Sequence, residues 1–249
     1  MSLRPVLALA LLCGAGCGAS APAARTTLPR ARRAAVAPPM RAEPRPVMQT
    51  FGLTGSLASD EVRHSLAGSE NDFAGCFTRE SARLPALGGR VTLSFHVAVD
   101  GRVARVHPVE STVGHRDVER CVTDVAQRIR FPRPHGGEAD FTWPLEMDPP
   151  LGVREPITWD PSRVRSLVRA RGRDVLEACG SVEPRSTIQV TTYVSHSGRV
   201  LSSGASTTDP LLADTLDCVA RAVRHWRMPH AGSRQAKVTF ELGATADAG

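Results

Sequence analysis

The chain contains the stretch GRVTLSFHVAVDGRV at residues 89–103, in which apolar side chains take every second place. The apolar members of this alternation are Val91, Leu93, Phe95, Val97 and Val99. A period of two is typical of a β-strand with one face in a core and the other in solvent. We therefore expect a half-buried strand here.

A hairpin follows this strand directly. The pair Asp100-Gly101 predicts a two-residue turn of type I′, because both central residues of that turn need a positive φ. Such a turn would pair Val97 with Ala104 and Phe95 with Val106. The apolar face of the sheet would then continue onto the return strand.

Helical patterns flank the hairpin, and a third strand closes the unit. Apolar residues at helical spacing are Val62, Leu66, Phe73 and Cys76 before it, and Val118, Cys121, Val122, Val125 and Ile129 after it. The first helix is predicted to open near Ser59 or Asp60, and the second to end before Phe131-Pro132. Alternation at residues 141–145 predicts the third strand. The order of elements is α-β-β-α-β.

The second half of the chain repeats this plan. A shift of 97 residues places Asp100–Val103 on Ser197–Val200 and Cys121 on Cys218. Cys76 corresponds to Cys179 at a shift of 103, so the second copy is shorter in its first loop. Two copies indicate a tandem duplication and not a solenoid.

Boundary signals support the second copy. Its helices open at Asp160-Pro161 and Asp209-Pro210, each an N-cap residue followed by proline at the first helical position. Strands are predicted at 188–194 and 238–242. In both copies the helices can cover one face of a small sheet, which indicates the α+β class. We expect two tandem modules, each with a three-stranded antiparallel sheet and two helices.

The N-terminus has the pattern of a secretion signal. Arg4 gives a positive start, Val6–Leu12 is a short apolar core, and small residues follow. The stretch LCGAGC at residues 12–17 resembles the cleavage box of bacterial lipoproteins, which implies a lipidated Cys17 and an acyl anchor in a membrane. The alternative is an ordinary signal peptide with incidental cysteines. Gly18 is not the aspartate of retained enteric lipoproteins, which by analogy favours the outer membrane, facing the periplasm.

The formal net charge of +6 comes from the N-terminal fifth of the chain. Residues 18–50 hold six arginines, six prolines and one acid, whereas 24 basic residues face 24 acids from Phe51 onward. Such a composition predicts a semi-rigid linker. It is either a solvated tether or a segment that binds peptidoglycan or anionic lipid through its arginines. A neutral body argues against nucleic acid as a partner.

The hairpin region resembles a known family. The pattern at 89–103, the pair Ser111-Thr112 and the triplet Arg130–Pro132 are similar to the TonB C-terminal domain. Cys76-Phe77 and the helical Cys121 are more similar to the AgmX/PglI C-terminal domain family, known mainly from myxobacterial envelope and gliding-motility proteins. The second copy is degenerate, and neither copy has the proline-rich transmembrane N-terminus of true TonB energy transducers.

Together these patterns divide the chain into four parts. They are a lipoprotein-type signal peptide at 1–17, a Pro/Ala/Arg-rich linker at 18–50, an AgmX/PglI-like TonB-C-like module at 51–150 and its degenerate copy at 151–245.

Four cysteines belong to the body of the chain: Cys76, Cys121, Cys179 and Cys218. An exported chain meets oxidising conditions, so this even number indicates disulfides. Of the three possible pairings, the duplication selects Cys76 with Cys121 and Cys179 with Cys218, each joining the two helices of one module. The sequence has no C-x-x-C and no close Cys/His cluster, so we expect no metal and no cofactor.

Enzyme motifs are missing from the sequence. The eight histidines form no H-E-x-x-H, and neither G-x-S-x-G nor a phosphate-binding loop occurs. We therefore expect a non-enzymatic, lipid-anchored binding or scaffold protein of the cell envelope. It would bind another, unidentified envelope protein at a groove or at its free sheet edge, which can accept a strand, and the family resemblance implies an envelope or gliding-motility complex. The alternatives are a lipoprotein that binds peptidoglycan or anionic surfaces, and a thiol-based redox enzyme.

Overall fold

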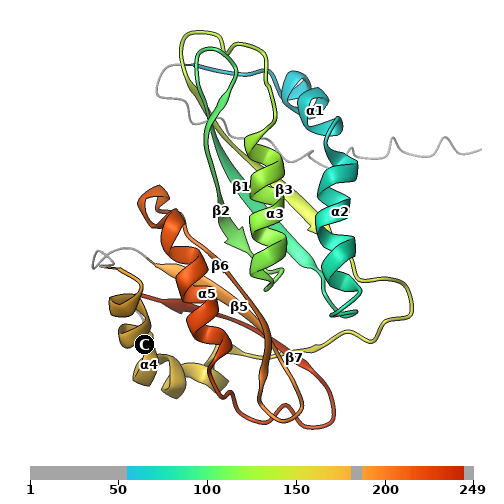
Figure 1. Cartoon of the computed structure of the whole chain (residues 1–249), viewed down its shortest axis with the longest axis vertical. Helices are drawn as coiled ribbons and strands as arrows, with labels where there is room; N and C mark the ends of the chain where they lie inside the picture. The colour runs from blue at the N-terminus through green and yellow to red at the C-terminus, as the bar shows by residue number, and fades with distance from the viewer. Residues whose placement is uncertain (1–54, 181–186, 244–249) are drawn as a thin grey trace, which may run out of the picture. The chain divides into compact units, whose positions relative to one another are not determined.

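A computed structural model describes residues 55–180 and 187–243 of the chain. These residues belong to one compact unit, Pro46–Gly249. The described part is α+β, with five α-helices, a three-stranded antiparallel sheet and a four-stranded mixed sheet (Figure 1). None of its helices is long and apolar enough to cross a membrane. The predicted signal peptide, Cys17 and the linker 18–50 lie outside the described residues.

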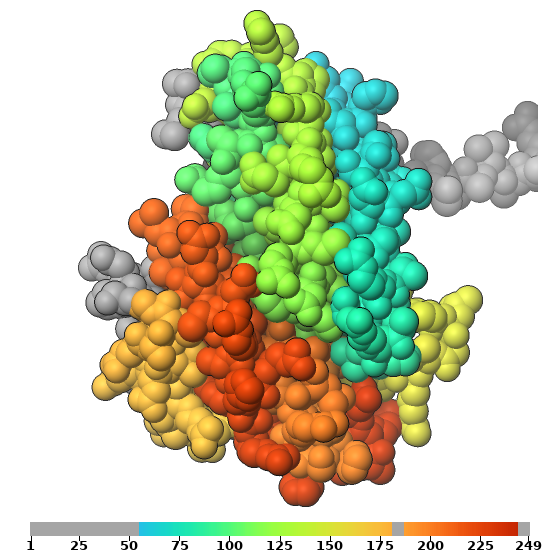
Figure 2. Space-filling model, viewed as in Figure 1, coloured from blue at the N-terminus to red at the C-terminus, as the bar shows by residue number. Residues whose placement is uncertain are grey.

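The first sheet has the strand order β2-β1-β3, with the predicted strand at its centre. Its elements are α1 (Ser59–Ala67), α2 (Glu70–Ser81), β1 (Gly89–Val97), β2 (Val103–Ser111), α3 (Arg116–Gln127) and β3 (Ala139–Met147). Helices α2 and α3 run side by side over one face of the sheet (Figure 1). Figure 2 shows their outer surfaces, from cyan to lime, joined into one continuous layer. The apolar face of β1 is fully buried beneath them.

The first helix of this module differs from the prediction, because two helices replace one. The backbone amide of Ser69 donates to the carbonyl of Leu66 at 2.9 Å, which closes α1, and Phe73 donates to Ser69 at 3.0 Å, which opens α2. Gly68 lies at the break, where its low helix propensity weakens a continuous helix. Both helices still contribute buried apolar residues to the same core.

The hairpin loop also differs from the prediction, because it has three residues and not two. The amide of Ala98 donates to the carbonyl of Arg102 at 2.8 Å, and the amide of Gly101 donates to Ala98 at 2.9 Å. Gly101 has a φ of +82°, the left-handed conformation that ends three-residue hairpin loops. Val99, expected on the apolar face, therefore lies in the loop and is 59% exposed.

The longer loop changes the pairing of the two strands near the turn. Phe95 faces Val106 as predicted, but Val97 pairs with Val103 and not with Ala104, because a register shift falls between His96 and Val97. The apolar face nevertheless continues across the hairpin, since Val97, Val103 and Val106 are all buried.

The second module repeats the plan with one additional strand. Its elements are β4 (Ile157–Thr158), η1 (Pro161–Val164), α4 (Arg165–Ala178), β5 (Ile188–Val194), β6 (Val200–Ser206), η2 (Pro210–Thr215), α5 (Leu216–Arg224) and β7 (Ala236–Leu242). Asp160 and Asp209 cap the helical segments as predicted, accepting from the amides of Ser162 and Leu211. Each cap opens a short 3₁₀ turn before the α-helix begins.

The strand β4 makes the second sheet mixed, whereas a purely antiparallel sheet of three strands was expected. The order is β4-β7-β5-β6, and β4 lies parallel to β7. The amides of Ile157 and Trp159 donate to the carbonyls of Gln235 and Lys237 at 2.9 and 2.8 Å. The extended backbone before a helix thus pairs with the neighbouring strand over two residues, too short a length to produce a visible alternation in sequence.

A polar contact joins the two modules at Gly88. The Gly88 amide donates to the hydroxyl of Tyr193 at 3.1 Å, and this hydroxyl donates back to the Gly88 carbonyl at 3.0 Å. Nζ of Lys237 donates to the same carbonyl at 2.7 Å and lies 5.2 Å from the centre of the Tyr193 ring. Burial lowers the pKa of Lys237 to about 8 and raises the pKa of Tyr193 to about 12.

The lowered pKa of Lys237 predicts that the protein becomes more stable as the pH rises from about 8 to about 10. An unfolded lysine has a pKa of about 10.4, so in this window the unfolded chain binds a proton that the folded chain has lost. We expect the free energy of unfolding to rise by about 1–2 kcal/mol, less than the full pKa shift implies, because the ammonium is partly solvated. Above about pH 10 the raised pKa of Tyr193 reverses the trend, since the unfolded phenol ionises first.

Urea unfolding at pH 7.5, 8.5 and 9.5 measures this effect. The variant Lys237→Met keeps much of the side chain's volume and has no group that titrates, so its stability should not change across the same window. If the free energy of unfolding rises with pH to a similar extent in both proteins, Lys237 is not the source of the effect.

Candidate functional site

A polar cleft of about 180 Å³ opens where the start of α3 meets β6 and α5. It is lined mainly by charged and hydroxyl side chains, namely Arg116, Arg120, Arg221, Arg224, Asp117, Asp217, His115, Ser202 and Ser203. The first module contributes α3, and the second contributes β6 and α5. Neither module alone therefore forms this site.

A glycine allows the two modules to approach each other here. A Cβ atom at Gly204 in β6 would lie 2.1 Å from Oε1 of Glu119 and 2.8 Å from the backbone nitrogen of His115. Real Cβ contacts are not that short, so a larger residue would push α3 and β6 apart. Beside it the hydroxyl of Ser202 donates to the carbonyl of Gly114 at 2.8 Å. Together these contacts hold the first turn of α3 against β6.

Glu119 is a fully buried carboxylate at this contact. It accepts hydrogen bonds from the Ser111 hydroxyl at 2.6 Å and from the Ala205 amide at 2.9 Å. Its Oε2 lies 3.6 Å from Nη1 of Arg116, an ion pair beyond hydrogen-bond distance. Burial raises the pKa of Glu119, against the smaller lowering effects of Ser111, Arg116 and Ala205. The group links both modules, because Ala205 belongs to β6 and the other partners to the first module.

Positive charge exceeds negative charge in the cleft. Arg116 and Arg120 share Asp217, and Arg120 also pairs with Asp117 at 2.9 Å. The two other arginines of the lining are Arg221 and Arg224. In the part of the chain that the structure describes, neither of these two forms an ion pair. Four arginines thus face two lining aspartates and the buried Glu119.

Several buried polar atoms of lining residues have no hydrogen-bond partner among residues 55–180 and 187–243. They are Oγ of Ser203, Nδ1 of His115 and Nη1 of Arg116. Ser203 is 1% exposed and His115 is 9% exposed. Burial lowers the pKa of His115, outweighing the nearby acids, so the imidazole is neutral at pH 7. An unsatisfied buried polar group costs roughly 1–3 kcal/mol, which a ligand of matching polarity would recover.

His115 also belongs to a group of potential metal ligands that the sequence did not predict. Ligand atoms of Glu80, His115 and Asp117 lie within 4.8 Å of one another. However, each carboxylate is already bound by a guanidinium group, Glu80 by Arg83 at 3.2 Å and Asp117 by Arg120 at 2.9 Å. These arginines compensate the negative charge that would attract a divalent cation, so the surroundings favour an anion over a metal.

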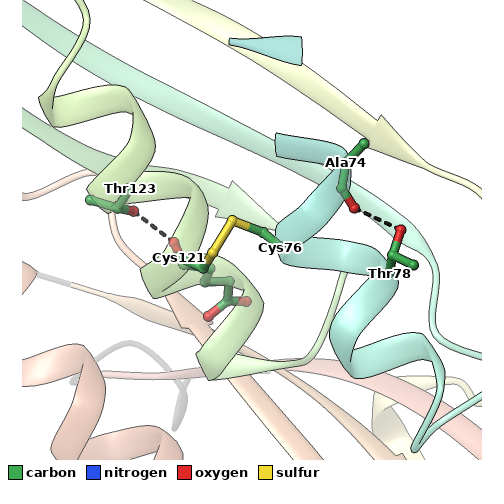
Figure 3. The surroundings of a disulfide bond; sticks show 6 residues. Ala74, Cys76, Thr78, Cys121 and Thr123 are labelled. Carbon is green, nitrogen blue, oxygen red and sulfur yellow. Dashed lines mark hydrogen bonds between the residues drawn. A yellow bond between two sulfur atoms is a disulfide. The ribbon is translucent and has the colours of Figure 1, made fainter. Parts of the chain in front are cut away.

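The four predicted cysteines form two disulfides with the expected pairing. Cys76 of α2 bonds to Cys121 of α3, and Cys179 at the end of α4 bonds to Cys218 of α5. Figure 3 shows the first bond crossing directly between the two helices. Disulfides persist in oxidising compartments, so both bonds suggest a protein that works outside the cytoplasm.

The outer edge of the first sheet is a second candidate site. The amide of Thr112 donates to the carbonyl of Arg90, so Arg90 and alternate residues of β1 direct their backbone groups toward β2. The backbone groups of Val91, and of every second residue after it in β1, then point toward β3, where Val91 pairs with Leu145. The backbone groups left on the outer side of β3 belong to Asp140, Thr142, Pro144 and Glu146. A proline is tolerated in a strand where its missing N–H faces away from the ladder, which agrees with Pro144 on this side.

The other sheet edges are at least partly covered. The amide of Thr207 donates to the carbonyl of Pro108, so the ends of β6 and β2 meet. The start of β7 is paired with β4. No strand of the described segments pairs with the outer side of β3, although the Gly55 amide donates to the carbonyl of Glu138 just before that strand begins.

The disulfides were predicted from the sequence, whereas the cleft was not. The cleft combines the first turn of α3 with Ser202-Ser203 and α5, about 90 to 100 residues further along, so no local motif marks it. Two unusual residues could have drawn attention to it. Gly204 lies inside a strand, where glycine often marks close backbone approach, and Glu119 lies next to Val118 on the apolar side of α3.

Comparison with known proteins gives no match. No family model, no curated protein and no solved structure matches the chain. The resemblance to the AgmX/PglI family therefore depends on the motifs of the sequence.

Proposed function

We propose that this chain is an exported, non-enzymatic binding protein of the bacterial cell envelope, anchored by a lipid on Cys17. Two TonB-C-like modules of the AgmX/PglI type extend from the linker 18–50. They bind another envelope protein through a sheet edge, in an envelope or motility complex. The two disulfides support an extracytoplasmic location.

The observation that carries this proposal is the outer edge of β3, with which no strand of residues 55–180 and 187–243 pairs. An extended segment of a partner can add to such an edge as a further strand, with main-chain hydrogen bonds supplying affinity. Donors face outward at Asp140, Thr142 and Glu146, whereas Pro144 supplies none. The proline shortens the run of donors and so limits uncontrolled pairing between edges. The edge therefore suits a short segment of a specific partner.

Removing one outward donor tests the proposal. Thr142→Pro deletes an amide on the outer side of β3 and leaves the ladder to β1 intact, because Thr142 and Ser94 are paired with their backbone groups pointing away from each other. Loss of one hydrogen bond and a clash with the incoming strand should weaken partner binding about tenfold. The measurement is cross-linking in intact envelopes, followed by mass spectrometry of the captured proteins.

Thr142→Val is the matched control, since it changes the same side chain and keeps the amide. It should capture the same proteins as the natural chain, and thermal melting should show that both variants are folded. Equal capture by the proline and valine variants would exclude the β3 edge as the binding site.

A further inference from the structure

We propose that the cleft between α3, β6 and α5 binds a small oxyanion group, a carboxylate or a phosphate. This site is distinct from the β3 edge and does not depend on the function proposed above. Its residues come from both modules, so a ligand there would contact the two halves of the compact unit at once.

The positive charge of the cleft is the first observation that supports an oxyanion site. Arg116 and Arg120 are four residues apart on α3, and Arg221 and Arg224 are three apart on α5, so each pair shares one helix face. All four line the cleft. A guanidinium group presents donors in a fork that matches the oxygens of carboxylate or phosphate. Because Arg221 and Arg224 form no ion pair within the described ranges, their charges are available to a ligand.

Unsatisfied buried donors are the second argument. The Ser203 hydroxyl is 99% buried and has no hydrogen-bond partner in the described part of the chain, whereas Nη1 of Arg116 has only the Glu119 carboxylate nearby, at 3.6 Å. Nδ1 of His115 is unpartnered too, and it donates in one of the two neutral tautomers. Polar atoms buried to this degree are normally hydrogen-bonded. Three of the seven unpartnered atoms of this kind among the described residues belong to residues that line this cleft, which agrees with an acceptor bound there.

The size of the cleft and the residues that line it limit the class of ligand that can bind there. The cavity of about 180 Å³ greatly exceeds the roughly 10–15 Å³ that one water needs. Among the described residues that line the cleft, Ala220 is the sole apolar one and none has a phenyl or indole ring for stacking. A nucleobase or a large apolar group would therefore gain little here. A single charged group, free or at the end of a larger molecule, fits the site.

A divalent cation is the competing occupant, at Glu80, His115 and Asp117. That group shares His115 and Asp117 with the cleft, so the two ligands would exclude each other. Arg83 and Arg120 occupy its carboxylates, and both the charge and the unpartnered donors favour the anion.

Calorimetric titration of the full chain with sodium phosphate and with sodium succinate, at constant ionic strength, tests the proposal. Binding of either anion supports the site, and the one that binds more tightly identifies the source of the oxyanion. The double variant R221Q/R224Q should weaken this binding at least tenfold. Both side chains are exposed, so the variant is not expected to disturb folding.

The matched control is R169Q/R171Q, which removes the same charge from exposed positions of α4 outside the cleft. It should bind as the natural chain does. The proposal is overturned if neither anion binds, or if both double variants lose affinity equally. It is also overturned if zinc chloride binds in place of the anions and H115A abolishes that binding.

Discussion

Replacing Cys76 and Cys121 together by alanine should lower the free energy of unfolding by about 4 kcal/mol. The bond closes a loop with a sequence separation of 45 residues, so its loss returns much conformational freedom to the unfolded chain. Alanine is preferable to serine because Cys76 is only 2% exposed, and a buried hydroxyl would add a cost of its own. The measurement is urea unfolding of the double variant beside the natural chain.

The other disulfide provides the comparison. Cys179 and Cys218 are 39 residues apart, so their replacement by alanine should cost nearly as much, again about 4 kcal/mol. Full reduction of both disulfides in the natural chain should lower the free energy of unfolding by more than either replacement by alanine does. A cost below about 1 kcal/mol for the first pair would show that the unfolded state is already compact around it.

The second large effect is expected at the contact between the modules. Gly204→Ala should destabilise the protein by about 3 kcal/mol, the upper end of the range for overpacking. The new Cβ would meet the buried carboxylate of Glu119 at 2.1 Å and the backbone of His115 at 2.8 Å. Neither can move freely, because Glu119 is held by Ser111 and Ala205. Thermal and urea unfolding measure the loss.

Gly75→Ala is the control for this substitution. Gly75 lies inside α2 with nothing within 4 Å of its virtual Cβ, so alanine there should be neutral or stabilise by about 0.5–1 kcal/mol. Gly204→Ala should cost less in an E119A background than in the natural chain, because the nearer of the two clashing groups is then absent. If Gly204→Ala is as stable as Gly75→Ala, the interface is looser than the structure indicates.

The fold was predictable where local patterns were long. The alternation in β1 and the repeat at 97 residues predicted the order of the main helices and strands along each module, and the repeat also predicted the disulfide pairing. The Asp100-Gly101 signal located the hairpin but not its loop length, because a left-handed glycine serves in both the two-residue and the three-residue forms. The strand β4 spans two residues, which is below the length at which periodicity can be read.

The cleft was not predictable, because its chemistry arises from the contact between modules. Arg116 and Arg120 have the spacing of an ordinary solvated helix face, as do Arg221 and Arg224. Only the close approach permitted by Gly204 brings the two helices to one cavity. A duplicated sequence describes each copy well and contains no local signal for how the copies meet.

The contact at Gly88 allows the junction between the two modules to be followed by NMR spectroscopy and by chemical modification. Tyr193 is the single tyrosine of the chain and Lys237 its single lysine. Selective isotope labelling of tyrosine would give one ring spin system in an NMR spectrum, reporting on a hydroxyl bonded to Gly88. An amine-directed reagent would have one side-chain target, which is partly shielded by its bond to the Gly88 carbonyl. A faster modification would therefore report that the contact at Gly88 has loosened.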